Sequence, residues 1–146
     1  MSDFIGTLPP TAVLQSNAEL FRNLLQQNIF KDVPAELMTQ LKPEMLRVYA
    51  KAEVIFREGE PVAALIVILA GHVDIVREQV VLVRRGPSEL LGEQGVVDDA
   101  PYSATAIARE EVHALVIPAQ LAREFLREQH FTFNLIKSLS AKLRAA

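Results

Sequence analysis

The chain has 146 residues, of which 50% are hydrophobic and 23% charged, with a formal net charge of −3 at pH 7. This length suits a single domain with a sizeable core, and the mild negative charge excludes an electrostatic surface for DNA on this chain alone. The absence of cysteine excludes disulfides and thiolate-bound metal sites. The start lacks a signal-peptide pattern, and the apolar run from Pro61 to His72 is shorter than the ~20 residues of a membrane helix. A soluble, cytoplasmic protein is therefore expected.

The N-terminal part of the chain is predicted to be helical. Residues 1–15 show no clear period and are interpreted as a loose lead-in to one domain spanning 16–144. Ser16 and Glu19 form a capping-box pattern before apolar residues at helical spacing, which predicts a helix of about three turns. A second helix is predicted to start near Pro34, because proline is tolerated in a first helical turn. These two helices make up a helical module over residues 16–43.

Short β-branched runs follow over residues 45–117. Glycine and proline residues separate these runs at near-regular intervals, which predicts an antiparallel sandwich or barrel. Glu78 and Gln79 lie between two apolar runs and predict a tight hairpin, although they lack the Asn-Gly pair that such turns favour. The expected fold is thus mainly β with flanking helices.

Two further helices are expected over residues 118–144. The first has a proline near its first turn and one apolar face. The second, from Phe131 to Leu143, carries an apolar stripe made of Leu135, Ile136, Leu139 and Leu143. That stripe has no partner left in the chain except the β-domain or another copy. A homodimer formed through the last helix is therefore one expectation.

The stretch Leu90 to Ala108, LLGEQGVVDDAPYSATAIA, has the composition of an anion-binding turn. A short helical turn containing Gly92 and Gly95 leaves backbone N–H groups free at its start, and these suit an anion. Glu93 beside them provides an acceptor for a hydroxyl group. The pattern indicates a ligand that is both anionic and hydroxylated.

The string EVIFREGEPVAALIVILAGHVDIV, Glu53 to Val76, followed by Leu90 to Ala108, resembles the cyclic nucleotide-binding domains of catabolite-activator-type regulators, kinase regulatory subunits and gated channels. The resemblance extends over roughly residues 29–144. It implies an antiparallel β-jelly-roll with flanking helices, in which a phosphate-binding cassette and the sheet enclose the ligand. It also implies that the last helix moves when the ligand binds.

The resemblance implies a role for each cassette residue. Gly92 matches the glycine that opens the cassette, and Glu93 matches the carboxylate that accepts the ribose hydroxyl. The remaining predicted ligand-binding residues are Gln94, Gly95, Tyr102, Ser103 and Ala104. Of these, Ser103 and Ala104 match small residues whose N–H groups face the cyclic phosphate.

Tyr102 departs from the family pattern, because it stands where the family has its phosphate-binding arginine. A tyrosine offers one neutral hydroxyl in place of a permanently charged fork, which is expected to weaken phosphate binding roughly ten- to a hundredfold. Arg84, Arg85 and Arg109 are candidates to replace the charge, but sequence spacing places none of them in the pocket. The alternative interpretation of Tyr102 is an aromatic plug that fills the space of the arginine and phosphate.

The leading functional hypothesis is a ligand-sensing regulatory domain whose ligand is cyclic AMP or cyclic GMP, as the resemblance implies, or another small molecule. One alternative is a ligand-free jelly-roll that serves as an interaction or dimerisation module. A second is the sensory half of a transcription regulator or other effector. Its output domain would then lie outside this sequence, because no helix-turn-helix motif follows the last helix. No enzyme, cofactor or metal site is expected, because nucleophile and phosphate-transfer motifs are absent and the histidines are scattered.

Overall fold

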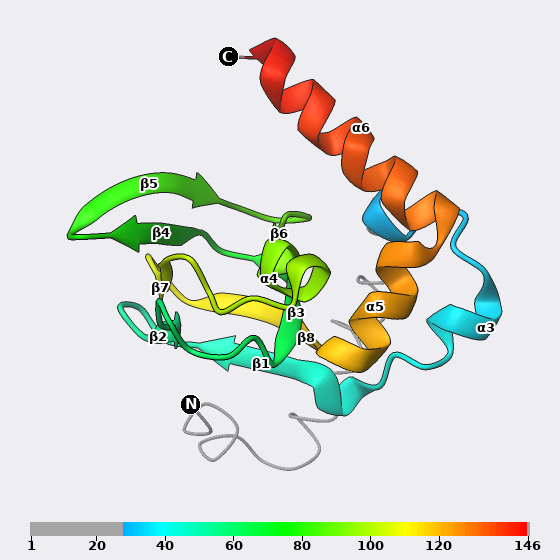
Figure 1. Ribbon diagram of the computed structural model, residues 1–146, viewed down its shortest axis with the longest axis horizontal. Coiled ribbons are helices and arrows are strands. Elements are labelled where there is room, and N and C mark those ends of the chain that lie inside the picture. The colour runs from blue at the N-terminus through cyan, green and yellow to red at the C-terminus, as the bar shows by residue number, and fades with distance from the viewer. Residues whose placement is uncertain (1–27, 146) are drawn as a thin grey trace.

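The computed structural model of the protein describes residues 28–145. The predicted lead-in over residues 1–15 and most of the first predicted helix lie outside the described residues. Figure 1 shows the β-strands gathered on one side of the molecule and helices α5 and α6 on the other, with α6 extending away from the sheets.

The predicted jelly-roll is confirmed as two four-stranded antiparallel sheets, with strand orders β1-β8-β3-β6 and β2-β7-β4-β5. The strands are β1 (Leu46–Tyr49), β2 (Val54–Phe56), β3 (Ala64–Ala70), β4 (Val73–Arg77), β5 (Val80–Arg85), β6 (Leu90–Leu91), β7 (Thr105–Ala108) and β8 (Val112–Pro118). Each begins within or next to an apolar run of the sequence.

The first sheet is the middle layer of the molecule, and β3 shows why. Its side chains alternate between two buried clusters: Leu65 and Val67 pack towards the helices, whereas Ile66 and Ile68 pack between the two sheets. A strand buried on both faces needs apolar residues at successive positions, which accounts for the uninterrupted sequence ALIVILA.

The hairpin predicted at Glu78 and Gln79 joins β4 to β5, with Arg77 paired to Val80 on either side of the turn. Both turn residues have positive φ angles, 52° and 66°. Two successive positive angles define the turn type that matches the twist of a hairpin, and Asn-Gly is its preferred sequence. Here Glu78 and Gln79 adopt the same backbone conformation, although residues with a Cβ atom are disfavoured at positive φ.

The helical parts of the described chain are short before the sheets and longer after them. They are η1 (Asn28–Phe30), α3 (Ala35–Met38), η2 (Pro43–Met45), α4 (Glu93–Asp98), α5 (Ala119–Arg127) and α6 (Gln129–Ala145). Helix α3 follows Pro34, as the sequence predicts, and has only four residues. Three phenylalanine rings pack together where η1, α5 and α6 meet, with ring centroids 5.5–5.8 Å apart: Phe30, Phe125 and Phe131. Within the described part of the chain, no helix is long and apolar enough to cross a membrane.

Helix α6 is fixed to the domain at its N-terminal half. Glu128 accepts a hydrogen bond from the backbone N–H of Phe131 at 2.8 Å, which caps the start of the helix. The side-chain amide of Asn134 donates to the carbonyl oxygens of Ile29 and Lys31, at 3.0 and 2.8 Å. The start of α6 is thereby joined to the chain that enters the domain.

The apolar stripe predicted on the last helix is divided by the structure. Leu135 packs against the buried core. The exposed large apolar side chains of α6 are Phe133, Ile136, Leu139 and Leu143. The stripe is therefore two surfaces, one that holds the helix to its own domain and one that faces outward.

Candidate ligand-binding site

The cassette forms a sharp strand-to-helix turn. Strand β6 ends at Leu91, and Gly92 follows with a φ of +82° as the residue before α4. A Cβ atom at Gly92 would lie 3.2 Å from both the carbonyl oxygen of Ala64 and the Cε1 atom of Tyr102. Both the backbone angle and the available space therefore favour glycine at this position.

Gly95 allows α4 to pack closely against the rest of the cassette. A Cβ atom there would lie 2.3 Å from Cγ2 of Val62 and 2.9 Å from the carbonyl oxygen of Ala100. The second glycine of the motif is thus required for close packing of a helix on its neighbouring loop, in addition to any contact with a ligand.

The cassette residues line one cavity of about 270 Å³. This volume is just below the ~300 Å³ at which typical small-molecule sites begin. Every residue that the sequence predicts for the site lies around the cavity: Gly92, Glu93, Gln94, Gly95, Tyr102, Ser103 and Ala104. The structure brings them together, and their contact with a ligand remains a prediction.

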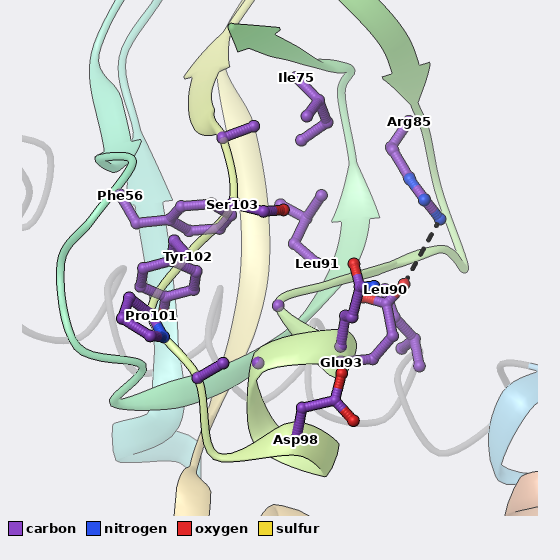
Figure 2. Close-up of a pocket in the computed structure, with 15 residues that line it drawn as sticks. Phe56, Ile75, Arg85, Leu90, Leu91, Glu93, Asp98, Pro101, Tyr102 and Ser103 are labelled. Carbon is purple, nitrogen blue, oxygen red and sulfur yellow. Dashed lines mark ion pairs between the residues drawn. The ribbon is translucent and has the colours of Figure 1, made fainter.

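Other residues also line the cavity, and of these the sequence offered only Arg85, as one of three candidate arginines. The other lining residues are Phe56, Ile75, Arg85, Leu90, Leu91, Asp98, Ala100 and Pro101. They come from strands β2, β4, β5 and β6, from the end of α4 and from the loop that follows it. Figure 2 shows the aromatic pair Phe56 and Tyr102 on one side of the cavity and Arg85 and Glu93 on the other.

The first side is an aromatic wall, defined by Phe56 and Tyr102. Their rings are stacked, with centroids 3.8 Å apart and an interplanar angle of 8°. Only 8% of Phe56 and 9% of Tyr102 is exposed. Burial raises the pKa of Tyr102, and hydrogen bonds from the backbone of Ala63 and Ala64 to its hydroxyl partly oppose this rise. Tyr102 is thus held as a neutral, packed side chain.

The backbone of Tyr102 is also fixed. Its N–H donates to the carbonyl oxygen of Glu60 at 3.0 Å, and its carbonyl oxygen accepts from the N–H of Gly59 at 2.9 Å. These bonds join the cassette to the loop after β2, which lies within the string Glu53 to Val76 that carries the family resemblance. The two motifs recognised in the sequence are therefore in direct contact in the fold.

The opposite side is a charged wall, defined by Arg85 and Glu93. Nη1 of Arg85 lies 3.9 Å from Oε1 of Glu93, and the side chains are 24% and 28% exposed. The separation is longer than a hydrogen bond, so the pair is loosely held. The other two candidate arginines, Arg84 and Arg109, both contact Asp74, at 3.0 and 3.3 Å.

Backbone donors complete the polar part of the site. Among the hydrogen bonds of the described residues, none uses the N–H groups of Ser103 or Ala104 as a donor. The carbonyl oxygen of Ser103 accepts a hydrogen bond from Nε of Arg77 at 2.9 Å, which fixes this part of the loop. The cavity lining thus brings Ser103 and Ala104 together with a guanidinium, a carboxylate and an aromatic surface.

Comparison with known families agrees with this architecture. The family model for the cyclic nucleotide-binding domain matches residues 46–129, which contain both sheets and the cassette. This chain belongs to the cyclic nucleotide-binding domain family.

A curated relative of this cyclic nucleotide-binding domain is the CRP-like cAMP-activated global transcriptional regulator of Mycobacterium tuberculosis. The two are 27% identical over 128 residues, a stretch that covers 83% of this chain and 57% of the relative. The chain therefore spans little more than half the length of that regulator.

Solved structures show the same fold. The catabolite activator protein of Thermus thermophilus is 25% identical, with a TM-score of 0.61, and the match covers 81% of this chain and 59% of that one. The sensor domain of the transcriptional regulator DNR from Pseudomonas aeruginosa is 23% identical, with a TM-score of 0.65 and coverage of 84% and 92%. The domain thus shares its fold with the DNR sensor domain and with part of the Thermus protein.

Proposed function

We propose that this cyclic nucleotide-binding domain senses a cyclic nucleotide, with cyclic AMP or cyclic GMP as the ligand, and has a regulatory rather than a catalytic role. The observation that supports the proposal is the single cavity around which the cassette residues gather. Glu93 supplies a carboxylate for a hydroxyl group, and the amides of Ser103 and Ala104 are available to an anion. The name of the mycobacterial relative, a cAMP-activated regulator, supports the same ligand class.

The response to the ligand would be a shift in the placement of α6. A ligand changes an equilibrium only by binding one conformation more tightly than another. Helix α5 lies between the cavity side of the molecule and α6, and it contacts both α4 and α6. A ligand that favours one position of α4 would therefore alter the packing under α5 and, through it, the position of α6.

Titration calorimetry of the purified chain with cyclic AMP and cyclic GMP tests the proposal. We expect binding of at least one ligand, and we expect Glu93→Ala to weaken it, because the ribose hydroxyl loses its acceptor. Val97→Ala is the matched control, since Val97 is exposed on the same helix and does not line the cavity. Absence of binding to either nucleotide at the highest soluble concentration would refute the proposal.

Tyr102→Arg provides a second test of the same site. An arginine at this position restores a charged fork for phosphate, so we expect cyclic nucleotide affinity to rise by roughly ten- to a hundredfold. The substitution also removes the aromatic stack with Phe56, so its stability is measured in parallel by thermal unfolding. A folded variant with unchanged affinity would show that the ligand's anionic group lies elsewhere.

Self-association through α6 is a second candidate function. It is favoured by the outward apolar surface of Phe133, Ile136, Leu139 and Leu143. Of these, Ile136, Leu139 and Leu143 follow the spacing of a coiled-coil seam. We expect sedimentation to show a dimer that dissociates in Leu139→Lys but persists in Ser140→Lys, a change at an adjacent exposed position. A monomer at all concentrations would exclude this function.

A further inference from the structure

We propose that Arg85 binds the anionic group of the ligand and supplies the positive charge that Tyr102 lacks. The inference rests on the proposed ligand-sensing function and assigns the charge to a strand outside the cassette. It implies that the ligand's anion is held from the β5 side of the cavity.

The position of Arg85 follows from the register of β4 and β5. Arg85 is paired with Val73, and Arg84 is paired with Asp74. Adjacent residues of a strand point to opposite faces of the sheet, so the two arginines point in opposite directions. Val73 is completely buried between the sheets, which places Arg85 on the inner side of the jelly-roll.

The two neighbouring arginines differ in their available bonding capacity. Arg84 donates from Nε to Oδ1 of Asp74 at 3.0 Å on the outer face. Within the described part of the chain, the guanidinium of Arg85 has one polar contact, the 3.9 Å ion pair with Glu93. Because a guanidinium carries five N–H donors in a planar fork, Arg85 retains donors for a bidentate contact with an oxyanion.

The charge balance of the cavity makes Arg85 decisive for anion binding. Among the described residues that line it, the charged side chains are Arg85, Glu93 and Asp98. Without Arg85 only carboxylates remain, and these would repel an anionic ligand. With Arg85 present, a cation and the hydroxyl acceptor Glu93 lie side by side. This pairing suits a ligand whose phosphate and hydroxyl groups are close together, as in a cyclic nucleotide.

The opposing explanation is that Arg85 only positions Glu93. The two explanations predict different ligand dependence. If Arg85 contacts the anion, its removal lowers the affinity for a charged nucleotide and leaves the affinity for the neutral nucleoside unchanged. If Arg85 only positions Glu93, its removal lowers the affinity for both ligands equally, because both carry the ribose hydroxyl.

The experiment compares Arg85→Gln with Arg84→Gln, an adjacent arginine that faces away from the cavity. Each variant is titrated calorimetrically with cyclic AMP and with adenosine at low and high salt. We expect Arg85→Gln to weaken cyclic AMP binding by roughly ten- to a hundredfold and to reduce its salt dependence. We expect unchanged adenosine binding, and Arg84→Gln should behave like the wild type.

Each outcome has one interpretation. Equal cyclic AMP affinity in Arg85→Gln and wild type refutes the inference but leaves the proposed function intact. An equal loss of affinity for cyclic AMP and adenosine refutes the contact with the anion and shows that Arg85 positions Glu93. Absence of cyclic AMP binding to the wild type refutes the proposed function for this ligand and the inference with it. Adding Tyr102→Arg to Arg85→Gln should recover cyclic AMP binding, because it returns a positive charge to the cavity.

Discussion

The two walls of the cavity are built in different ways. The aromatic wall of Phe56 and Tyr102 is part of the core, with both rings stacked and less than a tenth of either residue exposed. The charged wall of Arg85 and Glu93 is about a quarter exposed and is joined by one long ion pair. The shape of the site is therefore fixed by folding, whereas its charge is separable from folding. Substitutions on the two walls should consequently affect different measurements.

Phe56→Ala should have the largest effect on stability. Removing a buried aromatic ring leaves a cavity and deletes the stack with Tyr102, so we expect the free energy of unfolding to fall by about 3–5 kcal/mol. Arg85→Ala on the facing wall should change it by less than ~1 kcal/mol. Urea denaturation of both variants measures the difference. Similar losses in the two variants would contradict the division between the walls.

Gly95→Ala should have the next largest effect. The new methyl group would meet Val62 and the carbonyl oxygen of Ala100, and we expect this crowding to cost about 1–3 kcal/mol. The higher helix propensity of alanine, about 1 kcal/mol, would act in the opposite direction. Gln94→Ala on the exposed face of α4 serves as the control and should be nearly neutral. A Gly95→Ala variant as stable as the wild type would show that α4 can shift away from its neighbours.

Tyr102→Phe should produce a smaller, pH-dependent change. Losing the buried hydroxyl should cost about 0.5–1.5 kcal/mol at neutral pH. Because the pKa of Tyr102 is raised in the folded chain, the unfolded chain loses this proton first, and stability falls as pH rises above about 10. Tyr102→Phe should reduce this alkaline loss without abolishing it, since the pKa of Tyr49 is also raised by burial. Denaturation across the alkaline range provides the measurement.

The smallest effect is expected at the turn between β4 and β5, the strand that carries Arg85. Glu78→Asn combined with Gln79→Gly should stabilise the protein by roughly 0.5–1 kcal/mol, because asparagine and glycine tolerate the positive φ angles of the turn better than glutamate and glutamine do. Ligand affinity should remain unchanged, since neither residue lines the cavity. Gln79→Ala, which keeps a Cβ atom at a positive φ, should give no gain. Equal stability of the Asn-Gly variant and the wild type would indicate that the present turn is unstrained.

The jelly-roll and the cassette could be predicted because their signals are local. β-Branched runs separated by turns gave the strands, and the cassette residues are close together in sequence. Arg85 could not be assigned in the same way. The preceding residues Val80–Val83 are uniformly apolar, so no polar and apolar alternation indicates which of Arg84 and Arg85 faces inward. The β4–β5 pairing also shifts register between Ile75 and Val76, which sequence spacing does not reveal.

The aromatic wall shows a second limit of sequence reasoning. Phe56 ends the short strand β2, and its contact with Tyr102 joins residues far apart in the chain. The last helix shows a third limit. Leu135 and Ile136 both belong to the predicted stripe, yet adjacent helical residues point about 100° apart. Only the position of η1 and α5 determines that Leu135 packs inward and Ile136 faces outward.

The two hydrogen bonds of Asn134 give the molecule a mechanical property. They join α6 to the carbonyl groups of Ile29 and Lys31, more than a hundred residues earlier in the chain. A rotation of α6 about its axis would move the Asn134 amide away from both acceptors. The rotation must therefore either break the two hydrogen bonds or move the segment around Ile29 and Lys31 with the helix. The two bonds therefore couple a displacement of the first half of α6 directly to the segment that enters the first sheet.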